Sequence, residues 1–431
     1  MLAMVATLLL LAVSASAQIC PGNRVIRSSD TMTGPLQIIN TSTTVPNSLY
    51  VTTTTSRTHL AVSTSGVVNI EFGISTVGQG YGTIAGNPRG QGSNDLQTSR
   101  SAATYVAAGT HSVITGGVDN RVSGRTSGIL AGETNLVSGR SGSIAGGSGN
   151  ENAADYAFLG GGTSNIIASD SQRGVIVGGS NNSITDAVRS FIGSGIGNVI
   201  SESPHAFIGN GSLLQLGPSS QLSSIVNGQS HYMESPYSFI GGGYSNIIVS
   251  LAGSGRQAIC GGGSNSVTGD FGFIGGGFSN AANSSNTFVG GGYANNIEAD
   301  STYSGIASGR QNGISGEFGF IGGGQLNTIL FNSHHAIIGG GYANQISTDF
   351  AVIAGGNNSI IEGTYSGILG GDVNAVSGNY GGILGGSNNN LTSAAHYAAI
   401  AGGAGNQVSN THSFIGGGED NGVSGDFSAV L

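Results

Sequence analysis

The sequence predicts an all-β protein, most of which is a parallel β-solenoid, or β-roll, with coils of about 15 residues. Three observations support this fold class. The frame Ile-x-Gly-Gly-x-x-Asn-x-Ile/Val recurs twenty times between Ile114 and Ile415, at intervals of 15, 16, 17 or 19 residues. Glycine supplies 80 of the 431 residues, and each glycine inside a helix would cost about 1 kcal/mol. No stretch shows the apolar period of a core helix over three turns.

Composition argues against several other classes of protein. The glycines do not fall at every third residue, which excludes collagen. Ile and Val recur regularly, whereas disordered chains are usually poor in aliphatic residues and rich in charge. The formal net charge is −9, all 12 basic residues are Arg, and none follows Arg310, which argues against nucleic acid as a partner. Cys20 and Cys260 are too few to define a disulfide framework, so a free thiol is expected at Cys260.

Three segments precede the regular repeats. Residues 1–17 resemble a secretory signal, with an apolar core at 8–13 and small residues before the cleavage site. Residues 18–76 are predicted to form a short, strand-rich attachment segment, with strands at 49–51, 60–62 and 67–70. Within it, the run DTMTGPL at 30–36 resembles segments of phage and viral tail-fibre proteins; a Gly-Pro turn before a strand is the alternative. Residues 77–111 form a Gly- and Gln-rich transition, and residues 112–431 form the solenoid of about 20 repeats.

One copy of the repeat, from Tyr237 to Ile248, shows how a coil is expected to fold. Side chains alternate along a strand, so Ser238 and Ile240 should point to one side and Tyr237 and Phe239 to the other. Each coil then offers two strands of about five residues, joined by two corners. Because stacked strands lie about 4.8 Å apart, equivalent residues should form ladders: Ile inside, Asn at a corner and aromatic residues on one face.

Glycine and asparagine are expected to make the corners. Two successive glycines permit a positive φ and a tight turn. The Asn that follows tolerates left-handed geometry and can bond its own backbone. The corner residues selected on this basis are Gly241, Gly242, Gly243, Asn246, Gly276, Gly277, Asn280, Gly323, Gly324, Asn327, Gly340, Gly341 and Asn344. The core ladder is predicted to contain Ile240, Ile274, Ile306, Ile321, Ile338, Ile353, Ile368, Ile383, Ile400 and Ile415.

The run Ser-x-Ile-Gly-Gly-Gly-x-x-Asn-x-Ile resembles the YadA-like (Hep/Hag) head repeat of trimeric autotransporter adhesins, and repeats of fibre-like surface proteins of bacteria and giant viruses, over about residues 112–431. The resemblance implies a left-handed roll in which three chains pack side by side. A trimer also has a physical reason, because a thin coil buries little surface per residue and pooling cores across chains would stabilise it. The chain shows neither the stalk heptads nor the membrane strands of the autotransporters, so we do not expect it to anchor itself.

The sequence predicts no catalytic, cofactor or metal site. A phosphate-binding loop needs a following helix and usually a Lys, and neither accompanies these glycines. Asp270, Asp300, Asp349 and Asp426 lie at scattered turns rather than at the fixed offset of a calcium repeat. The eight histidines are dispersed and are expected to be solvated in loops. A thin roll also lacks the deep pocket with convergent polar groups that an enzyme needs, so we expect no enzyme activity.

These expectations favour a non-enzymatic, extracellular fibre or adhesin head, whose repetitive rod attaches to a host or a matrix. The alternative is a purely structural appendage or coat filament without a receptor. The expected partners are further copies of the chain, as a homotrimer or filament, and a host glycan or matrix protein. Neither nucleic acid nor a transmembrane segment in the mature chain is expected. An ice- or mineral-binding sheet would need a regular Thr ladder, which the repeat lacks.

Overall fold

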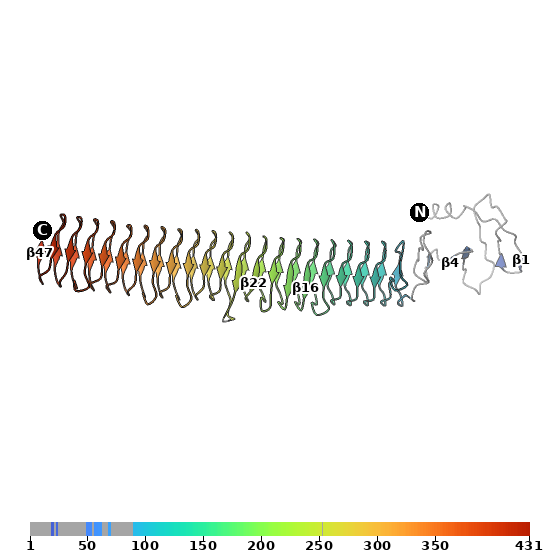
Figure 1. Cartoon of the computed structure of the whole chain (residues 1–431). Coiled ribbons are helices and arrows are strands. Elements are labelled where there is room, and N and C mark those ends of the chain that lie inside the picture. Colours follow the sequence, from blue (N-terminus) through green and yellow to red (C-terminus); the bar gives the residue numbers. More distant parts are fainter. Residues whose placement is uncertain are drawn as a thin grey trace. The chain divides into compact units, whose positions relative to one another are not determined.

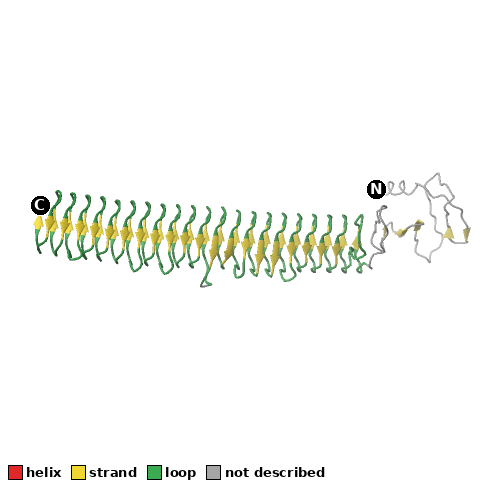
Figure 2. Ribbon diagram, in the orientation of Figure 1, coloured by secondary structure: helices red, strands yellow, loops and turns green. Residues whose placement is uncertain are grey.

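A computed structural model of the chain describes residues 89–251 and 253–431, together with the backbone of five short strands nearer the N-terminus. The described residues form strands, turns and loops but no helix (Figure 2). The chain divides into two compact units, Met1–Phe72 and Gly73–Leu431. The predicted signal at 1–17 and the tail-fibre-like run at 30–36 lie outside the described residues.

The first unit contains two small antiparallel sheets. One pairs β1 (Ile19–Cys20) with β2 (Asn23–Arg24), in a segment where the sequence predicts no strand. The other contains β3 (Leu49–Thr53), β4 (Ser56–Val62) and β5 (Val68–Asn69), with β4 in the middle. These three strands lie where the sequence predicts strands, and that prediction is confirmed.

The second unit is a parallel β-solenoid, as predicted, in which each regular coil adds one strand to each of two sheets (Figure 1). The sheets contain 22 and 20 strands. Pairing keeps equivalent residues in line: Phe239 lies opposite Ala258, and Ile240 opposite Ile259. The first paired strand, β6 (Asn94–Asp95), belongs to the range predicted as a transition and pairs with β7 (Val113–Ile114).

The strands of the first sheet are, in order, β6 Asn94–Asp95, β7 Val113–Ile114, β9 Gly128–Ile129, β11 Ser143–Ile144, β13 Phe158–Leu159, β15 Val175–Ile176, β17 Phe191–Ile192, β19 Phe207–Ile208, β21 Ser224–Ile225, β23 Phe239–Ile240, β25 Ala258–Ile259, β27 Phe273–Ile274, β29 Phe288–Val289, β31 Gly305–Ile306, β33 Phe320–Ile321, β35 Ile337–Ile338, β37 Val352–Ile353, β39 Gly367–Ile368, β41 Gly382–Ile383, β43 Ala399–Ile400, β45 Phe414–Ile415 and β47 Ala429–Val430.

The strands of the second sheet are β8 Arg121–Val122, β10 Leu136–Val137, β12 Glu151–Asn152, β14 Ile166–Ile167, β16 Ser183–Thr185, β18 Val199–Ser201, β20 Gln215–Leu216, β22 Tyr232–Glu234, β24 Ile247–Val249, β26 Ser266–Val267, β28 Ala281–Ala282, β30 Asn296–Ile297, β32 Gly313–Ile314, β34 Thr328–Ile329, β36 Gln345–Ile346, β38 Ile360–Ile361, β40 Ala375–Val376, β42 Asn390–Leu391, β44 Gln407–Val408 and β46 Gly422–Val423.

The strands are shorter than the five or so residues that the sequence predicts, because left-handed residues interrupt the chain around them. In the coil of β23, φ is 56° at Tyr237, 96° at Gly243 and 52° at Ser245. Between the two strands of each coil, one residue forms an isolated parallel bridge with its equivalents, as Tyr244 does with Gln229 and Gly263. Each coil therefore has three paired segments rather than two.

The core consists of two rows of side chains, which from Ile114 onward are apolar at every position except Asn152 in the second row. The first core row contains the equivalents of Ile240, and the second core row contains the equivalents of Ile248. Every member from Ile114 to Ile415 in the first row is fully buried, including all ten residues predicted for the core ladder. Burying each such side chain contributes about 1.5–3 kcal/mol, so these two rows supply the main hydrophobic stabilisation of the rod.

Coil length varies at a single corner. The number of residues between the first-row and second-row core positions is the same in every coil. The extra residues of the longer coils therefore come after the second core position. The longest insertion, which projects beside β22 and β24 in Figure 1, carries Leu251 at 80 % exposure. Asp270 holds the two ends of this insertion together. Its Oδ1 accepts hydrogen bonds from Ser250 Oγ at 2.7 Å and from the Gly255 N–H at 3.1 Å.

Candidate functional site

The predicted corner asparagines form a row, here called the Asn row, which is buried up to Asn406 and partly exposed at Asn421. Nδ2 of Asn280 donates to the carbonyl of Gly276 in its own coil and to that of Gly292 in the next coil, both at 3.0 Å. Oδ1 of Asn265 accepts the backbone N–H of Asn280 at 3.0 Å. Each Asn thus ties its corner to the coils on both sides. The row comprises Asn120, Asn135, Asn150, Asn165, Asn182, Asn198, Asn246, Asn265, Asn280, Asn295, Asn312, Asn327, Asn344, Asn374, Asn389, Asn406 and Asn421.

As predicted, these asparagines bond the backbone of their own corner, but they do not use the left-handed geometry that Asn tolerates. The preceding residue is left-handed instead, as Ser279 is with a φ of 56°. A left-handed residue that is not glycine costs about 1–2 kcal/mol, and the hydrogen bonds of the buried Asn side chain offset that cost.

Only the last glycine of each predicted corner needs to be glycine for its backbone conformation. Gly243, Gly277, Gly324 and Gly341 have φ between 84° and 96°. A Cβ on Gly277 would collide with the carbonyl oxygen of Gly292, whereas a Cβ on Gly276 would meet nothing within 4 Å.

Three residues interrupt the Asn row: Leu214, His231 and Ser359. His231 is 1 % exposed, which contradicts the expectation of a solvated loop histidine. Its Nδ1 accepts the Asn246 backbone N–H at 3.0 Å, and its buried Nε2 has no hydrogen-bond partner. Burial lowers the pKa of His231 below its ordinary value of 6.5, which favours the neutral ring that can act as an acceptor.

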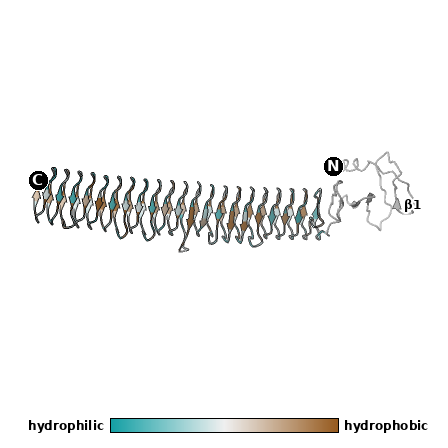
Figure 3. Cartoon of the chain, viewed as in Figure 1, coloured by the Kyte–Doolittle hydropathy of each residue, from teal (hydrophilic) through white to brown (hydrophobic). Residues whose placement is uncertain are grey.

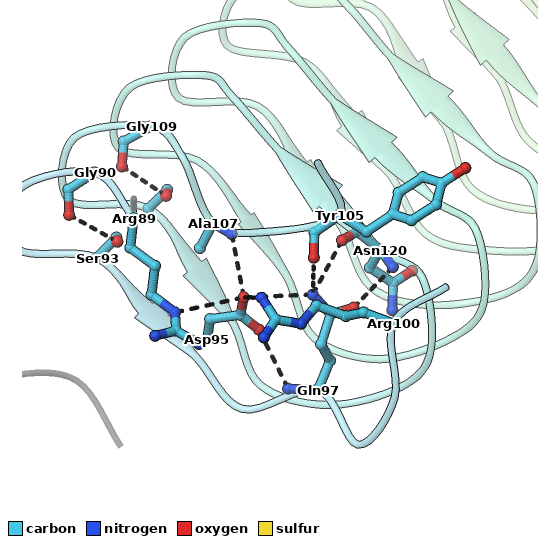
Figure 4. A network of polar contacts seen from close by, with 11 residues as sticks. Arg89, Gly90, Ser93, Asp95, Gln97, Arg100, Tyr105, Ala107, Gly109 and Asn120 are labelled. Atoms are coloured by element: carbon cyan, nitrogen blue, oxygen red, sulfur yellow. Dashed lines mark hydrogen bonds and ion pairs between the residues drawn. The ribbon is translucent and has the colours of Figure 1, made fainter. Parts of the chain in front are cut away.

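A polar network lies at the first described coil, where the first core row and the Asn row begin (Figure 4). Asp95 lies in line with Ile114 of the first core row and is 2 % exposed. Its carboxylate lies 3.6 Å from Arg89 Nε and 3.9 Å from Arg100 Nη1. Oε1 of Gln97 accepts the Asn120 N–H at 2.9 Å, so Gln97 begins the Asn row. The two Arg neighbours compensate the buried carboxylate at the first coil that the structure describes.

The aromatic row contains the equivalents of Tyr237, which are outward-facing and left-handed. From Tyr303 onward, nine successive coils present stacked rings, with centroids of neighbouring rings 4.6–5.3 Å apart and planes within 19° of parallel. These rings are Tyr303, Phe318, His335, Phe350, Tyr365, Tyr380, Tyr397, His412 and Phe427. The predicted aromatic ladder is therefore present, and it includes two histidines that were expected in solvated loops.

Nearer the N-terminus, rings of the aromatic row contact Arg side chains at two places. The Arg256 guanidinium lies 5.3 Å from the Tyr237 ring centroid and 5.4 Å from that of Phe271. Tyr156 lies between Arg140 and Arg173, at 5.5 and 5.7 Å. Cation–π contacts at exposed sites contribute about 0.5–1 kcal/mol each, so this part of the row also holds neighbouring coils together.

The outer side of the first sheet forms an uncharged strip, here called the flat face. It consists of the residues immediately before and after each member of the first core row, such as Phe239 and Gly241 around Ile240. None of these residues between Val113 and Leu431 is charged. Its most exposed large side chains include Leu130, Phe158, Val177, Phe288, Leu369 and Leu384, at 42–59 % exposure.

Large and small residues compensate one another across the flat face. Every Phe before a core residue is followed by Gly after it, at Phe158, Phe191, Phe207, Phe239, Phe273, Phe288, Phe320 and Phe414. A Cβ on Gly241 would collide with the carbonyl oxygen of Cys260 in the next coil, and it would also lie 3.3 Å from Cε1 of Phe239. Where Gly128, Gly367 or Gly382 comes first, Leu follows. Many coils thus present one large side chain, although Gly305 is followed by Ala307, and the pairs Ser143/Ala145 and Ala399/Ala401 present none. Aligning the repeats by sequence could have revealed this tendency.

The outer side of the second sheet is different. It carries charged residues, among them Arg121, Glu151, Glu234, Glu298 and Glu362. In Figure 3, the strands on the sheet that faces the viewer, which includes β16 and β22, vary from hydrophilic to hydrophobic from coil to coil. The two broad faces of the rod therefore differ in chemistry, and only the flat face is uncharged throughout.

A third surface, the bridge row, contains the equivalents of Tyr244 and carries a local aromatic cluster. The ring of Phe278 lies 6.1 Å from that of Tyr244 and 5.7 Å from that of Tyr293, measured between centroids. Arg310 lies 5.4 Å from the Tyr293 ring centroid. Tyr244 and Tyr293 are 49 % and 46 % exposed. Tyr244 occupies a variable position of the repeat, and the aromatic neighbours that surround it come from other coils.

The described residues include no group of three or more His, Cys, Asp or Glu side chains placed to hold a metal ion. The same part of the chain contains no apolar helix of membrane-spanning length. Scans against protein-family models and curated proteins found no match for this chain. The candidate sites are therefore surfaces: the flat face, the aromatic row and the bridge row.

Proposed function

We propose that this chain is the rod of a non-enzymatic extracellular fibre or adhesin head, in which copies pack side by side and display repeated side chains for attachment. The observation that carries the proposal is the flat face, which is uncharged along the entire described solenoid. Soluble monomers seldom expose apolar patches larger than a few hundred square ångströms, and larger patches usually mark interaction sites.

The size of the flat face supports an interface between copies. Twenty coils stacked at about 4.8 Å give a length of about 95 Å. Two rows of outward side chains span about 10 Å, so the face covers on the order of 900 Å². A standard protein interface buries roughly 800 Å² per partner. A partner with the same repeat spacing can match this face coil by coil, and a second copy of the chain has that spacing. Three copies, as the repeat resemblance implies, would enclose the flat faces between them.

The bridge row supplies the proposed attachment surface. Exposed Tyr and Arg side chains are enriched where proteins bind partners, and Tyr244, Phe278, Tyr293 and Arg310 lie together there. Several copies would present this cluster several times, so weak individual contacts to a glycan or matrix protein would add up. The route out of the cell rests on the predicted signal at 1–17.

Binding of the purified mature chain to arrays of glycans and matrix proteins tests the attachment role. We expect binding that a Tyr244→Ser/Tyr293→Ser variant loses and that a Thr328→Ser variant, altered on the second sheet, retains. Absence of binding above background at high avidity, together with end-to-end polymerisation, would instead favour a structural filament without a receptor.

A further inference from the structure

We propose that Tyr365, Tyr380 and Tyr397 form a dityrosine cross-linking site, in which one-electron oxidation joins neighbouring coils covalently. The three residues occupy the aromatic row in successive coils. Ring centroids are 5.1 Å apart for Tyr365 and Tyr380 and 4.7 Å apart for Tyr380 and Tyr397, with planes 4° and 3° from parallel. Among the described residues, these are the only stacked ring pairs in which both partners are Tyr.

The three phenol rings are accessible to an oxidant. Their exposures are 52 %, 47 % and 55 %. None of their hydroxyl groups has a hydrogen-bond partner within the described structure. Tyr232 provides a contrast, because its hydroxyl donates to Glu234 at 2.5 Å, and this bond raises the pKa of Tyr232 to about 12. On oxidation, the proton of an exposed phenol can pass directly to water.

Composition directs oxidation to tyrosine. The chain contains no Trp, so no indole competes for the oxidising equivalent. Cys260 is an exposed free thiol that could compete, but it lies far along the chain from this cluster and can be replaced without altering the aromatic row.

The oxidant is hydrogen peroxide, which a haem peroxidase uses to oxidise the phenols, and the reaction balances as follows. Each phenol loses one electron and one proton and becomes a phenoxyl radical. The two radicals join through their ortho carbons, and the two ortho hydrogens then move to the oxygens to restore the phenols. The electrons and protons reduce one hydrogen peroxide to two water molecules, so each link removes two hydrogen atoms from the chain.

The stack favours links within one chain. The backbone register of the parallel solenoid holds equivalent residues in adjacent coils side by side, and the exposed rings can rotate about the Cβ–Cγ bond to bring ring edges together. The resulting cross-links would join adjacent coils through tyrosines that are 15 and 17 residues apart in sequence. This inference is independent of whether the rod binds a receptor.

The test treats the mature chain, carrying Cys20→Ser and Cys260→Ser, with peroxidase and hydrogen peroxide, and measures dityrosine fluorescence. Cleavage before Asp leaves Tyr365 in the peptide 349–371, and Tyr380 and Tyr397 together in 372–419. We expect two products by mass spectrometry: the two peptides joined with loss of two hydrogens, and the peptide 372–419 with an internal loss of two hydrogens.

Tyr380→Phe is the decisive variant, because Phe already occupies this row at Phe318 and Phe350, so the stack is retained. We expect its dityrosine yield to fall to that of the chain unfolded in denaturant. Tyr342→Phe, in the bridge row, should keep the wild-type yield. The proposal is overturned if Tyr380→Phe keeps the full yield, if the links map mainly to other tyrosines, or if the yield per chain rises in proportion to protein concentration.

Discussion

The Nδ1 atom of His231 accepts the Asn246 backbone N–H at 3.0 Å, in the place where other coils use an Asn carbonyl oxygen. Only the unprotonated nitrogen can accept this bond. Burial lowers the pKa of His231, while the unfolded chain should protonate near the ordinary value of 6.5.

The rod should therefore lose stability in acid at this coil. As the pH falls through about 6.5, the unfolded chain binds a proton that the folded chain does not, so the free energy of unfolding decreases until the lower folded pKa is reached. Above about 6.5, His231 should contribute no pH dependence. His231→Asn restores the Asn row and should remove this part of the pH dependence, with a gain of about 1 kcal/mol. Denaturant titrations of both proteins between pH 5 and pH 8 check this; equal pH slopes would contradict it.

Much of the fold follows from the sequence, because the period and the alternation of side chains are local properties. The twenty repeats predict the solenoid, and Ser238 and Ile240 do point inward while Tyr237 and Phe239 point outward. The register of each coil could be predicted because a slip of one residue would expose the whole core row.

Other features depend on the neighbouring coil and could not be read from one repeat. The buried position of Asn280 is set by the carbonyl groups of Gly276 and Gly292 in two coils, and local turn propensity takes no account of the second coil. The aromatic cluster around Tyr244 includes Phe278, two coils away across Gly263. The burial of His231 follows from the column of asparagines that it joins, whereas the usual exposure of histidine predicts a solvated side chain.

Removing one member of the Asn row should destabilise the rod locally. Asn295 donates to the carbonyls of Gly291 and Gly309, both at 2.9 Å, and accepts the Asn312 N–H at 3.1 Å. Asn295→Leu leaves these groups without partners and should cost about 2–4 kcal/mol. Leu214→Asn, the reverse change, should stabilise the protein. Equilibrium unfolding measures both, and a neutral Asn295→Leu would argue against the role of the row.

The two glycines of one corner should respond differently to the same substitution. Gly277 has a φ of 90° and its Cβ would collide with the next coil, so Gly277→Ala should cost at least about 2 kcal/mol. Gly276 has open space around it, so Gly276→Ala should change stability by less than about 1 kcal/mol. Thermal unfolding of the two variants compares them directly. Equal effects would show that the corner geometry is not as described.

The thiol of Cys260 reports on the flat face. It is exposed in the single chain and lies directly after Ile259 of the first core row. If copies pack through this face, a maleimide should label Cys260 slowly in the assembled Cys20→Ser protein and rapidly after dilution or unfolding. Rapid labelling of the assembled protein would place the interface elsewhere.

The most direct test of the account is sedimentation equilibrium of the purified mature chain, compared with a variant that places a charge on the flat face. Val352→Glu puts a carboxylate on this face, where Val352 is 38 % exposed, and Gln345→Glu adds the same charge on the second sheet. We predict that the mature chain and Gln345→Glu sediment as one multi-chain species, with three copies expected, and that Val352→Glu shifts toward a folded monomer. A stable monomer of the unmodified chain would contradict the proposal that the flat face joins copies of this protein.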